Sequence, residues 1–141
     1  MQVILEHLYV NRELHHVIFE SICEKYDLTI TEIMILLLLD HEQIDTAKDI
    51  AMRFKIAKSH LSTSIRNLED KGYIYGEYVG KDHRTIHLHL CENASEVVNE
   101  SSKTYHNFFN VLVKGFDEDE KVQALNYLQR MIENANAFLN E

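Results

Sequence analysis

The stretch KSHLSTSIRNLEDKGYIYGEYVGKDHRTIHLHL, residues 58–90, decides the fold of this chain. Its first half carries Leu61, Ile65 and Leu68 at helical spacing, with polar side chains between them. Gly72 follows directly, and glycine takes the left-handed conformation of a helix C-terminus without steric cost. The first half therefore predicts an amphipathic helix over residues 57–71 with one polar outer face.

The second half of the same stretch alternates with a period of two, which is typical of strands. The runs YIYGEYV and TIHLHL flank the loop GKDHR at residues 80–84 and predict a β-hairpin over residues 73–90. The alternation directs Ile86, Leu88 and Leu90 toward the core. The outward positions are Thr85, His87 and His89.

Helical patterns precede this stretch. Residues 2–26 carry apolar side chains at nearly helical spacing. Thr29 and Glu32 have the spacing of a capping box, and the apolar run after them predicts a helix that is buried on most sides. Thr46 can cap a further short helix that ends before Lys55.

Two more helices are predicted after the hairpin. One runs from about Glu92 to Lys114 and ends at Gly115. Asp117 begins the last one, with Glu120 as its capping-box partner. The whole order predicts a mainly α fold with a small β-hairpin. A short helix, a tight break and a polar-faced second helix form a helix-turn-helix, and the hairpin behind it is the wing of a winged helix.

Composition narrows the class of protein. A chain of 141 residues with 45% hydrophobic and 26% charged residues is typical of one globular domain, alone or with appended helices. Only two cysteines occur, which favours a reducing, cytoplasmic location without disulfides. The N-terminus does not resemble a signal peptide, and no apolar run is long enough to span a bilayer. No motif indicates an enzyme, a cofactor or a phosphate-binding loop.

The wing residues carry a family resemblance. Asp82, Arg84, Leu88 and Leu90 match in register the wing signature of the MarR family of bacterial winged-helix transcription regulators. The segment SIRNLEDKGYI also resembles the family's passage from recognition helix to wing. The chain departs from the family at four positions, where other residues are frequent. These positions are Lys55, Ala57, Cys91 and Ala94.

The resemblance implies a homodimer that binds double-stranded DNA at a pseudo-palindromic operator and represses transcription. Residues 1–27 and 92–141 would supply the dimerisation helices, and residues 28–91 the winged helix-turn-helix domain. It further implies that Arg84 enters the minor groove while Asp82 holds its guanidinium. A small-molecule effector is a common feature of the family, and the aromatic and histidine residues that suit its pocket are Tyr9, His15, His16 and Tyr105.

The distribution of charge favours DNA binding although the net charge is −9. Residues 48–84 hold eight Lys and Arg against five Asp and Glu, whereas the rest of the chain holds six against eighteen. The cations are therefore concentrated in the helix-turn-helix and the wing, where phosphates would be met. The predicted DNA-binding residues are Lys58, Ser59, His60, Ser62, Thr63, Arg66, Lys81, Asp82, His83 and Arg84.

Two alternatives remain at this point. A winged-helix dimer can bind a protein partner instead of DNA, and a steep loss of duplex affinity with salt would distinguish the two. A metal-responsive regulator is the other, because His87, His89 and Cys91 lie on one face of a strand. Solvent-facing histidines explain the same pattern, so no metal ligand is assigned. Cys23 is predicted to be a buried small residue.

Overall fold

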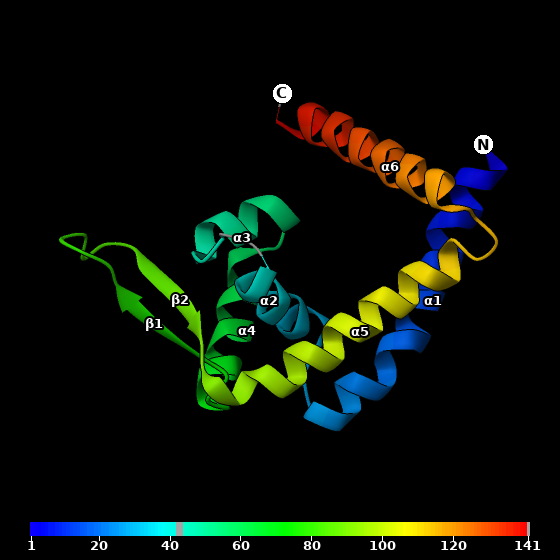
Figure 1. The fold of residues 1–141 in the computed structure, drawn as a ribbon. Coiled ribbons are helices and arrows are strands. Elements are labelled where there is room, and N and C mark those ends of the chain that lie inside the picture. The colour runs from blue at the N-terminus through cyan, green and yellow to red at the C-terminus, as the bar shows by residue number, and fades with distance from the viewer. Residues whose placement is uncertain (42–43, 141) are drawn as a thin grey trace. The chain divides into compact units, whose positions relative to one another are not determined.

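The computed structural model describes residues 1–41 and 44–140. Four helices come first: α1 (Gln2–Tyr26), α2 (Ile30–His41), α3 (Ala47–Phe54) and α4 (Lys58–Asp70). The strands β1 (Ile74–Tyr78) and β2 (Ile86–Leu90) follow, then a short 3₁₀ turn η1 (Glu92–Ala94), α5 (Ser95–Leu112) and α6 (Glu118–Leu139) (Figure 1). The predicted order of helices, hairpin and helices is confirmed.

Helix α2 supplies the centre of the core. Ile33, Ile35 and Leu36 are fully buried there, as the continuous apolar run predicted. Both capping-box bonds form: the Thr29 N–H donates to Glu32 Oε2 at 3.0 Å, and the Glu32 N–H donates to Thr29 Oγ1 at 3.2 Å. Helices α1, α3, α4 and α5 and both strands add further buried side chains to this core. They are Phe19, Ile22, Ile50, Leu61, Leu68, Ile74, Leu88, Val97 and Val98.

The turn between α3 and α4 forms without the residues that the family favours. Lys55 adopts the left-handed conformation at φ 53°, which costs a non-glycine residue about 1–2 kcal/mol. Ala57 precedes α4 and makes no side-chain cap. Burial of Ile50, Leu61 and Leu68 between the two helices and the core offsets these local costs, because a helix in a protein is stabilised mainly by its packed face.

The hairpin pairs Gly76 with Leu88 and Tyr78 with Ile86 in antiparallel register. A side chain at Gly76 would approach Ile86 Cγ2 to 2.6 Å, so a larger residue there would displace the side chain of Ile86. The expectation that Ile86 faces the core was wrong, since Ile86 is 48% exposed whereas Leu88 is 4% exposed. Only the base of the hairpin reaches the core, and alternation along a strand does not reveal where the core ends.

The outward positions of β2 also differ from the expectation. The side chains of His87 and His89 are only 27% and 33% exposed. The N–H of Leu88 donates to the carbonyl of Asp45 at 2.7 Å, so the segment before α3 lies along β2 and partly covers it. The wing is thereby attached to the helix-turn-helix at its base.

The last helices begin and end close to the predicted positions. The turn η1 occupies residues 92–94, so regular helix starts at Ser95 and ends at Leu112. Gly115 then takes φ +88°, and the capping box of Asp117 and Glu120 begins α6. Two compact units result, Met1–His106 and a second that begins at Asn107. Helix α6 contains no buried residue.

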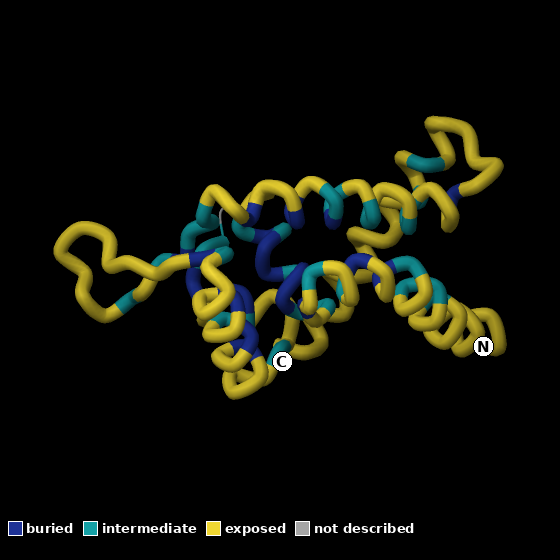
Figure 2. The backbone as a smooth tube through the Cα atoms, turned by 90° about the horizontal axis from the view of Figure 1, so that it is seen from below, coloured by how far each residue is buried: buried dark blue, intermediate teal, exposed yellow. Residues whose placement is uncertain are grey.

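Exposed apolar side chains occur at both ends of the chain. Figure 2 shows the N-terminal stretch in the colour of exposed residues. The largest exposed apolar residues of α1 are Val3, Ile4, Leu5, Leu8, Tyr9, Val10 and Val17. Those of α6 are Val122, Leu125, Tyr127, Leu128, Met131, Ile132, Phe138 and Leu139. Among the helices in the described ranges, none is long and apolar enough to cross a membrane.

Candidate nucleic-acid interface

Helix α4 has one buried and one exposed face. Leu61, Ser64 and Leu68 are buried, spaced three and four residues apart, and fix the helix on the core. The six residues of α4 that were predicted to contact DNA are all exposed. They are Lys58, Ser59, His60, Ser62, Thr63 and Arg66. The fold thus presents a continuous polar face with a cation near each end.

The first turn of α4 has no side-chain cap. Ala57 contributes no side-chain acceptor, and the hydroxyl of Thr63 donates to the carbonyl of Ser59 at 3.0 Å. The N–H groups of a helix's first turn lack partners within the helix and carry a partial positive charge. Lys58 adds a full positive charge at the same end, so this terminus suits an anionic group such as phosphate.

The wing loop presents its four predicted residues to solvent. Lys81, Asp82, His83 and Arg84 are all exposed. The carboxylate of Asp82 accepts the backbone N–H of Arg84 at 2.9 Å. This bond, followed by bonds from Thr85, lowers the pKa of Asp82 below its usual value of 3.8. The ring of His83 contacts that of Tyr78 edge-on, with centroids 5.8 Å apart.

The predicted hold of Asp82 on the guanidinium of Arg84 stays a prediction, and the structure shows a different contact of Asp82. Within the described part of the chain, its carboxylate forms no ion pair with the guanidinium of Arg84. The carboxylate instead fixes the backbone two residues ahead, as Asp side chains commonly do in tight loops. The loop is therefore shaped by Asp82, and the side chain of Arg84 is left able to reach outward.

The histidines of β2 have protein partners. His87 Nδ1 lies 2.9 Å from Asp45 Oδ2, and His89 Nε2 lies 2.9 Å from Glu77 Oε1. The ring of Tyr75 stacks on that of His89 with centroids 5.1 Å apart. Among residues 1–41 and 44–140, no three His, Cys, Asp or Glu side chains are placed to hold a metal ion. His87 therefore joins the wing to the segment before α3, whereas His89 contacts strand β1 within the hairpin.

The predicted effector residues fall into two groups. The rings of His15 and Tyr105 each contact that of the fully buried Phe19 with centroids 4.4 Å apart, and they contact each other edge-on at 6.1 Å. Burial lowers the pKa of His15 and raises that of Tyr105. Tyr9 is 61% exposed and packs against the guanidinium of Arg12 instead, and His16 is exposed. The structure brings together His15 and Tyr105 but neither of the other two.

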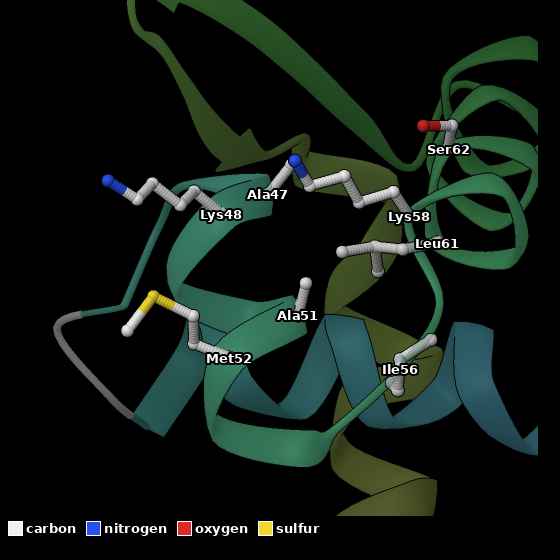
Figure 3. Close-up of a pocket in the computed structure, with 8 residues that line it drawn as sticks. All are labelled: Ala47, Lys48, Ala51, Met52, Ile56, Lys58, Leu61 and Ser62. Atoms are coloured by element: carbon white, nitrogen blue, oxygen red, sulfur yellow. The ribbon is translucent and has the colours of Figure 1, made fainter. Parts of the chain in front are cut away.

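A hollow of about 580 Å³ lies elsewhere, between α3 and the start of α4. Figure 3 shows Ala51, Ile56 and Leu61 along its apolar wall, with the side chain of Lys58 reaching across toward Ala47. Sequence reasoning missed this hollow. The signal was the pair of small residues Ala47 and Ala51, one helical turn apart, which leaves room on one face of α3.

A helix-turn-helix with an exposed polar second helix and a wing attached beside it defines a winged-helix regulator. A profile of the family described as transcriptional regulator SarA/Rot matches residues 17–101. The chain therefore belongs to the SarA/Rot family of transcriptional regulators, a family of regulators and not of enzymes.

Individual relatives agree with this assignment. The chain is 26% identical over 113 residues to the HTH-type transcriptional regulator SarZ of Staphylococcus haemolyticus (strain JCSC1435), covering 79% of this chain and 74% of SarZ. A MarR transcriptional regulator from Methanosarcina mazei Go1 has the same fold, with a TM-score of 0.84, 20% identity and coverage of 98% and 92% of the two chains. The resemblance to the MarR family is therefore confirmed for the fold.

A solved structure of a regulator with DNA is also similar. It is that of a MarR family transcriptional regulator from Listeria monocytogenes complexed with 26mer DNA. Its TM-score to this chain is 0.83 at 18% identity, with coverage of 95% of this chain and 89% of that one. At this level of identity the likeness concerns the fold.

Proposed function

We propose that this chain is a DNA-binding repressor that acts as a homodimer in the cytoplasm. The observation that carries the proposal is the exposed polar face of α4, with all six predicted contact residues on it, beside an exposed wing loop that carries Lys81 and Arg84. The Listeria regulator of the same fold was solved in complex with 26mer DNA, which supports this use of the fold. Members of this class place the second helix of the motif in the major groove.

Each part of the surface has a role that its chemistry suits. Arg66 can donate two hydrogen bonds to guanine in the major groove or contact a phosphate. Lys58 and the first turn of α4 suit a phosphate. Arg84 suits the narrow minor groove of an A·T stretch, where negative potential is concentrated. Asp82 contributes by shaping the loop that presents Arg84.

Dimerisation is proposed because the terminal helices expose more apolar surface than a monomer in water tolerates. Leu125, Leu128 and Ile132 form one stripe on α6 at helical spacing, and each is nearly half exposed. Leu8 on α1 is 60% exposed. Contiguous exposed apolar surface of this kind marks an interface. A two-fold partner would bury both helices and place two copies of α4 about one helical turn of DNA apart.

The test is a binding titration of the wild-type chain and Arg84→Ala with a duplex enriched from a random pool by the wild-type chain. We expect Arg84→Ala to weaken binding about 10-fold or more and to leave the dimer intact, because only a wing-tip cation is lost. Arg130→Ala is the matched control, since Arg130 is an exposed arginine of α6 outside the winged helix. Equal affinities of the Arg84 variant and wild type would remove the wing from the mechanism.

Salt dependence distinguishes DNA binding from a protein partner. Each lysine or arginine that contacts a phosphate releases bound counterions, and this release is less favourable at high salt. Affinity for a duplex should therefore fall steeply between 50 and 200 mM salt, by about 10³-fold or more for six contacts. Failure of the wild-type chain to enrich any sequence, or a flat salt profile, would favour the protein-binding alternative.

A response to a small ligand is supported best by the hollow between α3 and α4. Its wall is apolar, and Lys48 and Lys58 stand among its lining residues, which suits a small apolar molecule with an anionic group. Lys58 and Ser62 belong both to this hollow and to the proposed DNA-binding face, so an occupant would compete with DNA. Met52→Trp should fill the hollow, and a ligand found by thermal-shift screening should then lose its effect.

A further inference from the structure

The C-terminal half of α4 forms hydrogen bonds with the turn after α1 and with the first turn of α2. The side-chain amide of Asn67 donates to Glu32 Oε1 at 3.0 Å. One turn further on, the ammonium group of Lys71 donates to the carbonyl of Asp27 and lies 3.3 Å from Asp27 Oδ2. Two contacts on successive turns fix the rotation of a helix better than one, because the first alone would allow the helix to pivot about it.

Glu32 is an unusual anchor because its carboxylate is buried. The residue is 2% exposed, and its other oxygen, Oε2, accepts the N–H of Thr29 at 3.0 Å. A buried carboxylate is tolerated only where its oxygens are hydrogen-bonded, and the N-terminal turn of α2 adds a favourable dipole. Glu32 is therefore fixed by its own helix, and Asn67 meets an acceptor that does not move.

The backbone at Asp27 is equally constrained. Asp27 takes φ 51° and ψ 50°, the left-handed conformation that ends α1, and its N–H bonds back to the carbonyls of Cys23 and Glu24. Asp is among the few residues other than glycine that adopt this conformation readily. The carbonyl that receives Lys71 thus belongs to a defined turn and not to a loose loop.

The same segment also contacts α5. Lys25 Nζ lies 2.6 Å from Glu100 Oε1, and the hydroxyl of Tyr26 donates to Glu96 Oε1 at 3.3 Å. The ion pair lowers the pKa of Glu100 and raises that of Lys25. Residues 25–32, which we call the α1–α2 junction, are therefore bonded to α5 through one set of side chains and to α4 through another.

We propose that the α1–α2 junction sets the orientation of α4 against α1 and α5, and that Glu32, Asn67, Asp27 and Lys71 are positioning residues for the reading of DNA sequence. This inference rests on the proposed function. Hydrogen bonds to base edges require placement within about 0.5 Å and 10–20°, whereas lysine and arginine contacts to phosphates tolerate more movement. Loosening the junction should therefore reduce sequence discrimination more than general affinity for DNA.

Asn67→Ala tests the proposal without changing any charge. Its affinity is compared for two duplexes of equal length, one enriched from a random pool by the wild-type chain and one with that sequence scrambled. We expect affinity for the enriched duplex to fall about 10-fold, affinity for the scrambled duplex to stay within about two-fold, and the salt slope to be unchanged. A merely structural role would not lower the ratio of the two affinities.

Two further variants make the result decisive. Val113→Ala removes part of a buried side chain from outside the junction and serves as a control for lost stability, so it should keep the ratio. Glu32→Gln keeps one acceptor oxygen for Asn67 but places an NH₂ group, itself a donor, against the Thr29 N–H. It should therefore lower the melting temperature while retaining most of the discrimination.

The outcomes separate this inference from the proposed function. An unchanged ratio in Asn67→Ala, or an equal loss of the ratio in Val113→Ala, would overturn the positioning role while DNA binding by the wild-type chain stands. If the wild-type chain enriches no sequence at all, the proposed function fails, and the positioning role fails with it. That failure is visible before any variant is measured.

Discussion

The winged-helix region buries its large apolar side chains, whereas the terminal helices expose many of theirs. In residues 28–91 the large apolar side chains of α2, such as Ile33 and Leu36, are fully buried against other elements. In α6 the stripe of Leu125, Leu128 and Ile132 has the same helical spacing and remains about half exposed. The same pattern thus leads to a closed core in one region and to an open surface in the other. This difference is what the proposed dimer predicts, because a partner chain would cover the stripe on α6, whereas α2 is already buried within this chain.

Breaking the proposed partner surface should have the largest effect. In Leu125→Asp/Leu128→Asp, a two-fold interface would lose four leucines, each contributing about 1.5–3 kcal/mol when buried. We expect the dimer to dissociate at least about 100-fold more readily in sedimentation experiments. Asn126→Asp adds a charge to the opposite side of α6 and should leave the dimer intact. If the wild-type chain stayed monomeric at high concentration, the exposed stripe of α6 would not be a dimer interface.

Breaking the closed core should have a smaller effect that does not depend on a partner. Leu36→Ala removes a fully buried side chain of α2 and should lower the free energy of unfolding by about 2–5 kcal/mol. Urea denaturation at several protein concentrations measures this loss. Leu8 is 60% exposed, so Leu8→Ala should weaken only the dimer, and its effect on the free energy of unfolding should vary with protein concentration. A similar concentration dependence for both variants would contradict the distinction.

Removing the contact that attaches the wing should lower the free energy of unfolding by a smaller amount. Asp45→Ala removes the contact with His87 but leaves the backbone bond between Asp45 and Leu88. We expect a loss of about 0.2–1 kcal/mol in unfolding experiments, as for other partly exposed ion pairs. Glu77→Ala breaks a contact within the hairpin itself, and unlike Asp45→Ala it should not alter the amide exchange of Leu88.

The smallest effect concerns the wing loop. Because the folded pKa of Asp82 is lowered, its bond to the Arg84 N–H stabilises the loop above the unfolded pKa and is lost as pH falls through the folded pKa. An NMR titration of the Arg84 amide should therefore have its midpoint below pH 3.8. Thr85→Val removes a hydroxyl donor to Asp82 and should move that midpoint upward. A midpoint at or above 3.8 in the wild-type chain would exclude the bond.

Much of the fold was predictable because its signals are local. Thr29 with Glu32 and Asp117 with Glu120 form capping boxes within three residues, and both are present. The predicted residues of α4 are all exposed, as a role in DNA contact requires, although that role stays a prediction. Ile86 was misplaced, since two-residue alternation specifies a face and does not specify how far the core extends along it.

The sequence by itself determined the helices, the hairpin and the concentration of cations over residues 48–84, because each depends on residues close together in the chain. Only the tertiary structure decided the contacts of Asn67 with Glu32 and of His87 with Asp45, which join residues 35 and 42 positions apart. The hollow between α3 and α4 was decided in the same way. Such contacts depend on the angles at which helices pack, and those angles result from the fit of many side chains at once.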